Sequence, residues 1–317
     1  MCTAISFKTA SHYFGRNLDL EKSYGERVVI TPRKFPLVLR NSSPVLSHYA
    51  MIGMATVEDC FPLYYEATNE KGLSMAGLSF PDNAHYFPLS QGKENIAVFE
   101  FIPWILGKCE SVAEAAQLIA NANLTETDFS EKLPSSPLHW LISDSEKSIT
   151  VECMKGGMKI CENPFGILTN NPPFEYHCMN INNYMSLSPQ LAKNNLTAET
   201  ALHNYSLGMG ALGLPGDYSS ASRFVKAVFV KENSVCGIDE NESVNQFFRI
   251  LDSVAMPRGC VLTKSGELEY TRYSCCCNTD TGVYYYKTYS DTAVTAVEMR
   301  SANLDGNELI QNPLISC

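Results

Sequence analysis

The chain has 317 residues, of which 45% are hydrophobic and 18% charged, and its formal net charge is −10 at pH 7. A chain of this length can bury a large core in one or two domains. Its acidic balance argues against a nucleic-acid partner, which would need a basic patch. No apolar run reaches the length of a membrane span, and no basic segment followed by an apolar core opens the chain. We therefore expect neither membrane association nor a secretion signal.

The chain contains twelve cysteines and six histidines. In a chain of this length without a visible signal, we expect the cysteines to be reduced thiols of a cytoplasmic protein. No Cys-x-x-Cys pair occurs, and no two histidines lie at a metal-ligand spacing. The sequence therefore predicts no metal site and no other cofactor.

The second residue is the first candidate for chemistry. Removal of Met1, which we expect, would leave a thiol and a free α-amino group together on Cys2. A residue of this kind can act as nucleophile and base at once, because the thiol attacks while the amine accepts the proton. An α-amino group titrates near pH ~8, so it can serve as a base around neutrality. Position alone does not establish this role, since every chain has a second residue.

The residues that follow predict a hairpin. Apolar side chains recur at period two over residues 3–7 and 13–20, with Ser11 and His12 near the turn. Such a hairpin would bring Arg16 and Asp19 back toward Cys2. A guanidinium near a thiol favours the reactive thiolate, and a carboxylate can orient the amine or a substrate amide. The alternative is an ion pair on the surface of a hairpin.

Further strands and a few helices follow along the chain. Antiparallel pairing is predicted for residues 63–68 with 73–80, 138–143 with 148–154, 154–161 around a Gly-Gly turn, and 282–289 with 292–299. The run 275–277 of three cysteines lies on a predicted strand, so neighbouring side chains should alternate between faces. Ser111 with Glu114 forms a capping box before one helix, and Ser243 with Gln246 is predicted to cap another. Both helices have apolar stripes that we expect to face the core.

Several motifs in order resemble the choloylglycine hydrolase family of N-terminal-nucleophile amidases, which includes bile salt hydrolases and penicillin V acylases. The motifs cover residues 1–3, 14–19, 69–78, 168–172, 213–217, 222–224 and 284–289. The resemblance implies a single domain over residues 1–317, of the α+β class. Its expected architecture is a four-layer αββα fold with two stacked antiparallel sheets between helical layers. Family members are commonly homotetramers, so we expect that assembly here.

The resemblance also implies a catalytic site. Cys2 matches the family's nucleophile, Arg16 the group beside the thiolate, and Asp19 the group near the amine and the substrate amide. Asn170 matches a residue of the oxyanion region, and Arg223 matches a second arginine that supports the charge network. Without the family, Asn170 would be interpreted as a turn residue and Arg223 as a surface cation at the start of a helix.

One position departs from the bile salt hydrolase pattern. Those enzymes usually carry Leu-Asn-Phe where this chain has Leu78-Ser79-Phe80, and the family Asn helps to form the oxyanion hole. Ser79 keeps its backbone N–H but has a shorter side-chain donor. Loss of one oxyanion donor can lower the rate by about 10² to 10³. We expect Ser79→Asn to raise turnover on conjugated bile salts.

The implied activity is hydrolysis of conjugated bile salts. Cys2 would form a thioester with the bile acid and release glycine or taurine, and water would then release the acid. The alternative on the same site is a penicillin V acylase or another N-acyl amide hydrolase. Leu18 and Tyr24 fall where the family lines an apolar substrate pocket, and Leu207 falls in a loop associated with the choice of head group. The sequence does not predict a preference between glycine and taurine.

Two functions from other classes use the same residues differently. A cysteine–histidine protease would need a histidine and an orienting group, for which His139 and His177 are available. A non-catalytic bile-acid-binding protein, inactivated through Ser79, would bind the same ligands without cleaving them.

Overall fold

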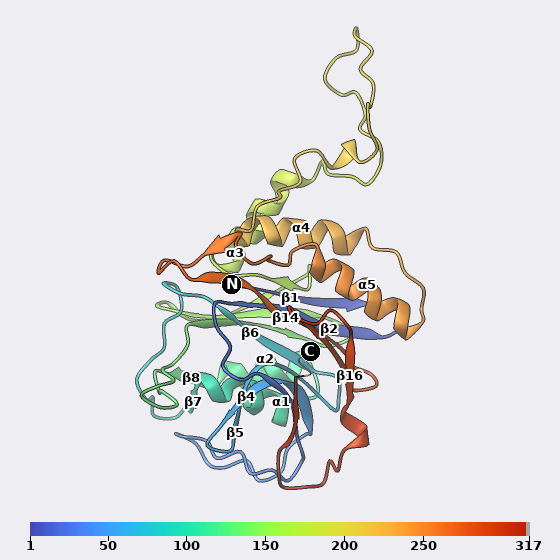
Figure 1. Cartoon of the computed structure of the whole chain (residues 1–317). Coiled ribbons are helices and arrows are strands. Elements are labelled where there is room, and N and C mark those ends of the chain that lie inside the picture. Colours follow the sequence, from blue (N-terminus) through green and yellow to red (C-terminus); the bar gives the residue numbers. More distant parts are fainter. Residues whose placement is uncertain (315–317) are drawn as a thin grey trace.

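Two large antiparallel sheets are stacked at the centre of the protein, and helices cover both outer faces (Figure 1). The computed structural model describes residues 1–314, so residues 315–317 of the expected single domain lie outside the described part. The strands of the 7-stranded sheet are β1 (Cys2–Lys8), β2 (His12–Leu20), β12 (Ile167–Leu168), β13 (Val261–Leu262), β14 (Leu268–Asn278), β15 (Val283–Thr288) and β16 (Thr295–Glu298). Their order is β12-β1-β2-β14-β15-β16, with β13 beside β14.

The 8-stranded sheet has the order β11-β10-β9-β6-β5-β4-β3-β17. Its strands are β3 (Arg27–Thr31), β4 (Met51–Glu58), β5 (Phe61–Asn69), β6 (Ser74–Ser79), β9 (Leu138–Ser143), β10 (Ser148–Met154), β11 (Gly157–Glu162) and β17 (Ile310–Pro313). A separate parallel pair is formed by β7 (Glu94–Ala97) and β8 (Ala122–Thr125). Every pairing within the two large sheets is antiparallel, as the tight turns in the sequence predict.

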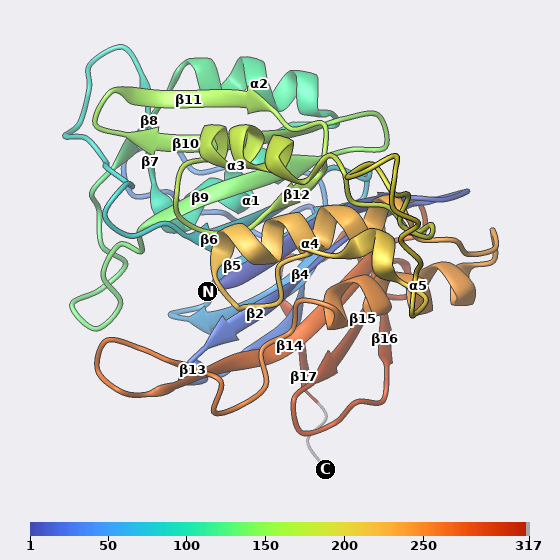
Figure 2. The ribbon, with the colours of Figure 1, turned by 90° about the horizontal axis from the view of Figure 1, so that it is seen from above.

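Helices form the two outer layers. They are α1 (Phe101–Lys108), α2 (Val112–Ala120), α3 (Phe174–Asn180), α4 (Ser220–Glu232) and α5 (Glu240–Asp252). The helix α5 packs on β2 and β14, α4 packs on β1 and β12 beside α3, and α1 packs on the other sheet against β4, β5 and β6 (Figures 1 and 2). This arrangement confirms the expected α+β class and the four-layer αββα order. Within the described residues, no helix is long and apolar enough to cross a membrane.

Apolar side chains fill the space between the layers. The cluster that contains Ile5, Leu78 and Leu141 joins the two sheets, and the cluster around Trp104 and Trp140 joins the 8-stranded sheet to α1 and α2. Burying one such large side chain contributes about 1.5 to 3 kcal/mol. The eleven described cysteines are free thiols, and those of the 275–277 run are all buried on β14.

The two helix caps had different outcomes. The Oγ of Ser111 accepts a hydrogen bond from the Glu114 N–H at 3.3 Å, so the cap at Ser111 is confirmed. The reciprocal half of the predicted capping box does not form, because the Glu114 carboxylate accepts from the Glu110 N–H at 2.8 Å and not from Ser111. The predicted cap at Ser243 is wrong, because α5 begins earlier and Asp239 caps it, accepting from the Asn241 N–H at 2.8 Å. A carboxylate at this position satisfies free N–H groups and also meets the positive end of the helix dipole.

A long segment extends away from the body of the protein. We call residues 186–218 the arm; it leaves the helical layer near α3 and returns to α4 (Figure 1). Its regular structure is one short 3₁₀ helix, Met209–Ala211. A side-chain amide closes its outer part, since Asn204 accepts from the Ala192 N–H at 3.1 Å and donates to the Ala192 carbonyl at 2.9 Å. Most of the arm lies away from the two sheets and the helices that cover them (Figure 1).

Candidate active site

Strand register brings Cys2 and Asn170 together. The β1–β2 hairpin forms as predicted and pairs Cys2 with Leu18. On the other side of β1, β12 pairs Leu168 with Ala4, so the chain after β12 continues toward Cys2. The Cys2 N–H donates to Asn170 Oδ1 at 2.8 Å, and only 3% of Cys2 is exposed. The predicted nucleophile therefore lies at a buried strand end beside a side-chain amide.

The start of α4 holds the segment that carries Asn170. Ser219 caps the helix by accepting from the Ser222 N–H at 3.4 Å. The next hydroxyl, on Ser220, accepts from the Asn170 N–H at 2.8 Å. Because the helix begins at this point, Arg223 in its first turn projects toward β1.

Arg223 joins three groups at the site. Its Nη1 donates to the Cys2 carbonyl at 2.5 Å and to Thr3 Oγ1 at 2.6 Å, while Nη2 donates to Asn170 Oδ1 at 2.7 Å. Burial lowers the pKa of Arg223, and the neighbouring Asp19 and Cys2 side chains oppose this only in part. Arg223 therefore fixes the backbone of Cys2, the predicted nucleophile, and the carbonyl end of the Asn170 amide.

Arg16 lies on the face of β2 that looks toward the 8-stranded sheet and is fully buried. Its Nη1 donates to the Gly77 carbonyl at 2.6 Å, and its Nε lies 3.8 Å from Glu66 Oε2. Burial alone would lower the pKa of Arg16, but the acidic groups of Cys2, Tyr273 and Glu66 raise it overall. Its Nη2 is buried and has no hydrogen-bond partner among the described residues.

Glu66, the counter-ion of this arginine, is a residue that the sequence patterns did not predict. Glu66 accepts hydrogen bonds from Tyr273 at 2.8 Å and Tyr284 at 2.6 Å, and the Cys275 thiol lies 3.4 Å away. Burial raises the pKa of Glu66, although Arg16 and the two phenols oppose this. The available signal was an acidic residue inside a predicted strand, which needs a partner if it is buried.

Asp19 and the first residue lie at the end of the β1–β2 pairing. Asp19 Oδ1 accepts from Thr271 Oγ1 at 2.6 Å, and Oδ2 is buried without a partner within residues 1–314. The Met1 amine donates to the Asp19 carbonyl at 2.9 Å and contacts Glu269. Burial lowers the pKa of this amine. While Met1 is present, the nitrogen of Cys2 is a peptide N–H and not a base.

The backbone groups of Ser79 face the free edge of β6. Phe80 N–H donates to the Pro137 carbonyl at 2.8 Å and the register pairs Ser79 with Leu138, so the N–H and C=O of Ser79 point away from β9. On that edge, Asn170 Nδ2 donates to the Ser79 carbonyl at 2.8 Å. An amide NH₂ carries two hydrogens, so Asn170 retains a second donor. Asn170 thus lies beside Cys2 and also against the free edge of β6, which the Ser79 N–H faces.

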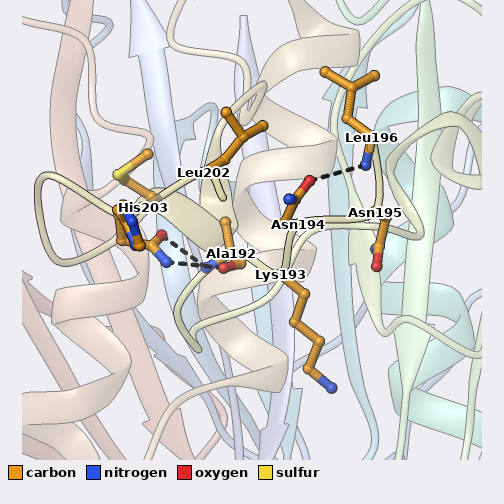
Figure 3. Close-up of a pocket in the computed structure, with 9 residues that line it drawn as sticks. Ala192, Lys193, Asn194, Asn195, Leu196, Leu202 and His203 are labelled. Atoms are coloured by element: carbon orange, nitrogen blue, oxygen red, sulfur yellow. Dashed lines mark hydrogen bonds between the residues drawn. The ribbon is translucent and has the colours of Figure 1, made fainter. Parts of the chain in front are cut away.

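The three predicted substrate contacts lie in different surroundings. Leu18 is 3% exposed and lies opposite Cys2, whereas Tyr24 is 40% exposed and stacks under the Lys22 ammonium at 5.0 Å. Leu207 is 87% exposed and belongs to the arm, so this single chain does not bring it to the other site residues. The arm also contains an open hollow, lined by Ala192, Leu196, Leu202 and other residues of the arm (Figure 3).

Both histidines considered for a protease bind the backbone behind Asn170. His139 Nε2 lies 3.0 Å from the Thr169 carbonyl, and His177 Nε2 lies 3.0 Å from the Asn170 carbonyl. Each nitrogen is thus occupied by a backbone acceptor. This arrangement argues against either ring as the base of a cysteine–histidine protease.

The chain matches known proteins over nearly its whole length. The sequence model of the family described as linear amide C-N hydrolases, choloylglycine hydrolase family, matches residues 2–312. The chain is 50% identical over 316 residues to a bile salt hydrolase/transferase of Lactiplantibacillus plantarum, covering 100% of this chain and 98% of the relative. It is 37% identical over 314 residues to a bile salt hydrolase/transferase of Clostridium perfringens, covering 98% and 95%.

Two solved structures resemble the whole chain. A conjugated bile acid hydrolase from Clostridium perfringens superposes with a TM-score of 0.92 at 37% identity, covering 99% of this chain and 97% of the other. A penicillin V acylase from Agrobacterium tumefaciens superposes with a TM-score of 0.78, covering 100% and 92%, but its identity is 17%. The second likeness therefore shows the shared N-terminal-nucleophile fold alone.

Proposed function

Because the chain belongs to the choloylglycine hydrolase family of linear amide C-N hydrolases, we propose that it cleaves conjugated bile salts. The bond broken is the amide between the bile acid and glycine or taurine. The observation that carries the proposal is the buried Cys2, whose nitrogen is bonded to an Asn170 amide that Arg223 holds in turn. The 50% identity to a bile salt hydrolase/transferase over the whole chain supports this substrate class.

The nucleophile becomes complete when Met1 is removed. The nitrogen of Cys2 then becomes an α-amine in the place where Asn170 Oδ1 already accepts its hydrogen. The unpartnered Oδ2 of Asp19 supplies a second acceptor at this strand end. The amine takes the thiol proton as the sulfur attacks the amide carbonyl, so no histidine is required.

The donors around β6 stabilise the tetrahedral intermediate. We expect two donors to bind the oxyanion: the backbone N–H of Ser79, which faces the free edge of β6, and the second hydrogen of Asn170 Nδ2, whose amide lies against that edge. The Nη2 of Arg16 lies on the thiolate side of the same space. The α-ammonium then returns its proton to the departing nitrogen, and the C–N bond breaks to leave a thioester on Cys2.

Hydrolysis of the thioester completes the cycle. The α-amine accepts a proton from water while the hydroxide oxygen bonds to the acyl carbon. The C–S bond then breaks and the α-ammonium gives its proton to the departing sulfur, which releases the bile acid and restores the Cys2 thiol and the free α-amine. Leu18 and Tyr24 contact the acyl group along the way, and this part of the proposal rests on the position of Leu18 directly opposite Cys2.

We further propose that the protein is a cytoplasmic homotetramer. Exposed apolar side chains on the arm support self-association, because Leu196 and Leu207 are each 87% exposed. For Leu207 to contact substrate, the arm must reach the site of another copy. The free thiols of the described cysteines are consistent with a reducing compartment.

Release of glycine and taurine from glycocholate and taurocholate tests the function directly. We expect both amino acids to appear with the purified protein and none with Cys2→Ala, whose methyl group cannot form a thioester. Penicillin V serves as the competing substrate, and intact mass reports whether Met1 has been removed. Cleavage of penicillin V alone would assign the protein to the acylase alternative. Binding of glycocholate without release, in protein that has lost Met1, would support the non-catalytic alternative.

A further inference from the structure

A buried histidine–glutamate pair lies behind the oxyanion donors. His139 on β9 and Glu152 on β10 are cross-strand neighbours, and both are completely inaccessible to solvent. The Nε2 of His139 lies 3.0 Å from the Thr169 carbonyl, while its Nδ1 lies 3.2 Å from Glu152 Oε1. Both ring nitrogens therefore face oxygen atoms.

These contacts determine how many hydrogens the His139 ring and the Glu152 carboxyl group carry together. A carbonyl only accepts, so Nε2 of His139 carries a hydrogen. In a neutral ring, Nδ1 would then present a lone pair to an ionised Glu152, and the two acceptors would repel each other. One more proton must lie between Nδ1 and Oε1, either as an imidazolium beside a carboxylate or as an imidazole beside a carboxylic acid. Both forms leave the pair neutral overall, which suits a dry interior.

The same pair touches both elements that carry oxyanion donors. Glu152 Oε1 also accepts from the Phe174 N–H at 2.8 Å, at the start of the helix α3. The ring of Phe80, directly after Ser79, stacks on His139 with centroids 4.2 Å apart and planes 6° apart. The pair thus contacts the chain immediately beside Ser79 and the chain immediately before Asn170.

We propose that His139 and Glu152 share one proton and act as positioning residues for the Ser79 and Asn170 donors. The ionised form of either residue alone would break the contact to Thr169 or leave a buried charge unpaired. The catalytic consequence rests on the function proposed above, whereas the shared proton does not.

The other titratable groups near the pair do not replace the shared proton as the partner of the Glu152 carboxylate. His177 on α3 faces both members, but burial lowers its pKa and keeps it neutral. Burial also raises the pKa of the Cys161 and Cys178 thiols, which therefore remain uncharged beside Glu152. On β11, the ammonium of Lys159 interacts with Glu152 and is paired with Glu175 of α3 at the surface.

The test replaces the acid by its amide. In Glu152→Gln, the atom at the Oε1 position must either accept from Phe174 or donate to a neutral His139, and it cannot do both. We expect kcat on glycocholate to fall by about 10- to 100-fold with KM within about twofold, because donors are misplaced while the substrate pocket is intact. The matched control is Glu162→Gln on β11, which is exposed and should leave kcat unchanged.

Nitrogen NMR of ¹⁵N-histidine-labelled protein detects the hydrogens on the His139 ring nitrogens, and this measurement does not depend on enzymatic activity. We assign the His139 resonances by their loss in His139→Gln. In the wild type we expect a hydrogen on Nε2 and a second, shared hydrogen at Nδ1 at pH 7, and in Glu152→Gln we expect the shared hydrogen to be lost. A wild-type ring whose Nδ1 neither carries a hydrogen nor accepts one from Glu152, or a Glu152→Gln variant with wild-type kcat, would overturn the proposal. A wild type without bile salt cleavage but with the shared proton counts against the proposed function alone.

Discussion

The region around Cys2 and the arm differ in which side chains are buried and which are exposed. Around Cys2 the charged side chains of Arg16, Asp19 and Arg223 are at most 1% exposed. On the arm, Leu196 and Leu207 are each 87% exposed. In the first region polar groups are held inside, and in the second apolar groups are held outside.

The difference shows which parts of the site one chain can build. A buried polar group is stable only when its hydrogen bonds are satisfied, so each buried side chain is fixed by several neighbours. An exposed leucine gains nothing from its own chain and has no comparable constraint. We therefore expect substitutions around Cys2 to affect stability and rate strongly, and substitutions on the arm to affect mainly association.

The largest effect is expected for Arg223→Met. The variant removes the arginine donors to the buried Cys2 carbonyl and Thr3 Oγ1, and one of the two donors to Asn170 Oδ1, at a cost of about 4 kcal/mol in the free energy of unfolding. Urea titration measures this loss. The control is Arg249→Met on the exposed face of α5, which should change the free energy by less than about 0.5 kcal/mol. Equal effects of the two substitutions would contradict the comparison between buried and exposed groups.

The next effect is a pH dependence from His12. Burial lowers the pKa of His12 from 6.5 to about 4, while its ring bonds to Ser6 and Thr279. The unfolded chain therefore binds the extra proton first, and stability falls as pH decreases from about 6.5 toward about 4. The loss at pH 4 should be about 3 kcal/mol.

A matched variant isolates this contribution from that of the carboxylates. His12→Gln has no group that titrates in this range, so the wild type should lose about 3 kcal/mol more than the variant between pH 7 and pH 4. Urea unfolding at both pH values measures the difference. A difference that does not depend on pH would show that His12 is not buried as a neutral ring.

A smaller effect is expected for Ser79→Asn. The backbone N–H of Ser79 already faces the free edge of β6. The asparagine side chain therefore adds one donor to an oxyanion hole that is already formed. We expect kcat on glycocholate to rise by up to about tenfold, or about 1.4 kcal/mol in the barrier. Ser79→Ala, which keeps the same N–H, should stay within about threefold of wild type. Unchanged or lower turnover in Ser79→Asn would show that the side chain at position 79 is not a donor to the oxyanion.

The smallest effect on folding is expected on the arm. Replacing Leu196 and Leu207 by serine should change the free energy of unfolding of one chain by less than about 0.5 kcal/mol, because both are already in solvent. The same double variant should lower the molar mass measured by light scattering, because the apolar contact between copies is lost. A large loss of stability with unchanged mass would show that the arm packs on its own body.

Some of the site followed from sequence because it is local. The hairpin that carries Cys2, Arg16 and Asp19 is predicted by apolar alternation, and the antiparallel pairing of β1 with β2 confirms it. Asn170 and Arg223 were named through family motifs alone, since a turn residue and a helix-start cation have no local signal for a shared site. Their roles, like that of Leu207, stay predictions.

Other features depend on contacts that no short stretch encodes. A bulge at Tyr65 lets Met54 pair with Glu66 and Ala55 pair with Tyr64, so Tyr64 and Glu66 face opposite sides despite their spacing of two. Simple alternation would place both on one face. Glu66 meets Arg16 only because this bulge turns its carboxylate toward the other sheet.

The sequence by itself determined the class of strands and the family, and it predicted Cys2 as the nucleophile, because periodicity and ordered motifs are properties of the chain. Tertiary structure alone decided which donors face Cys2, which acid balances Arg16, and why two histidines serve the backbone and not the thiol. These outcomes depend on β-register, a bulge and the packing of α3 and α4 on β12. A hydrogen bond needs its partners within about 3 Å, and only the folded chain brings residues so distant in sequence to that separation.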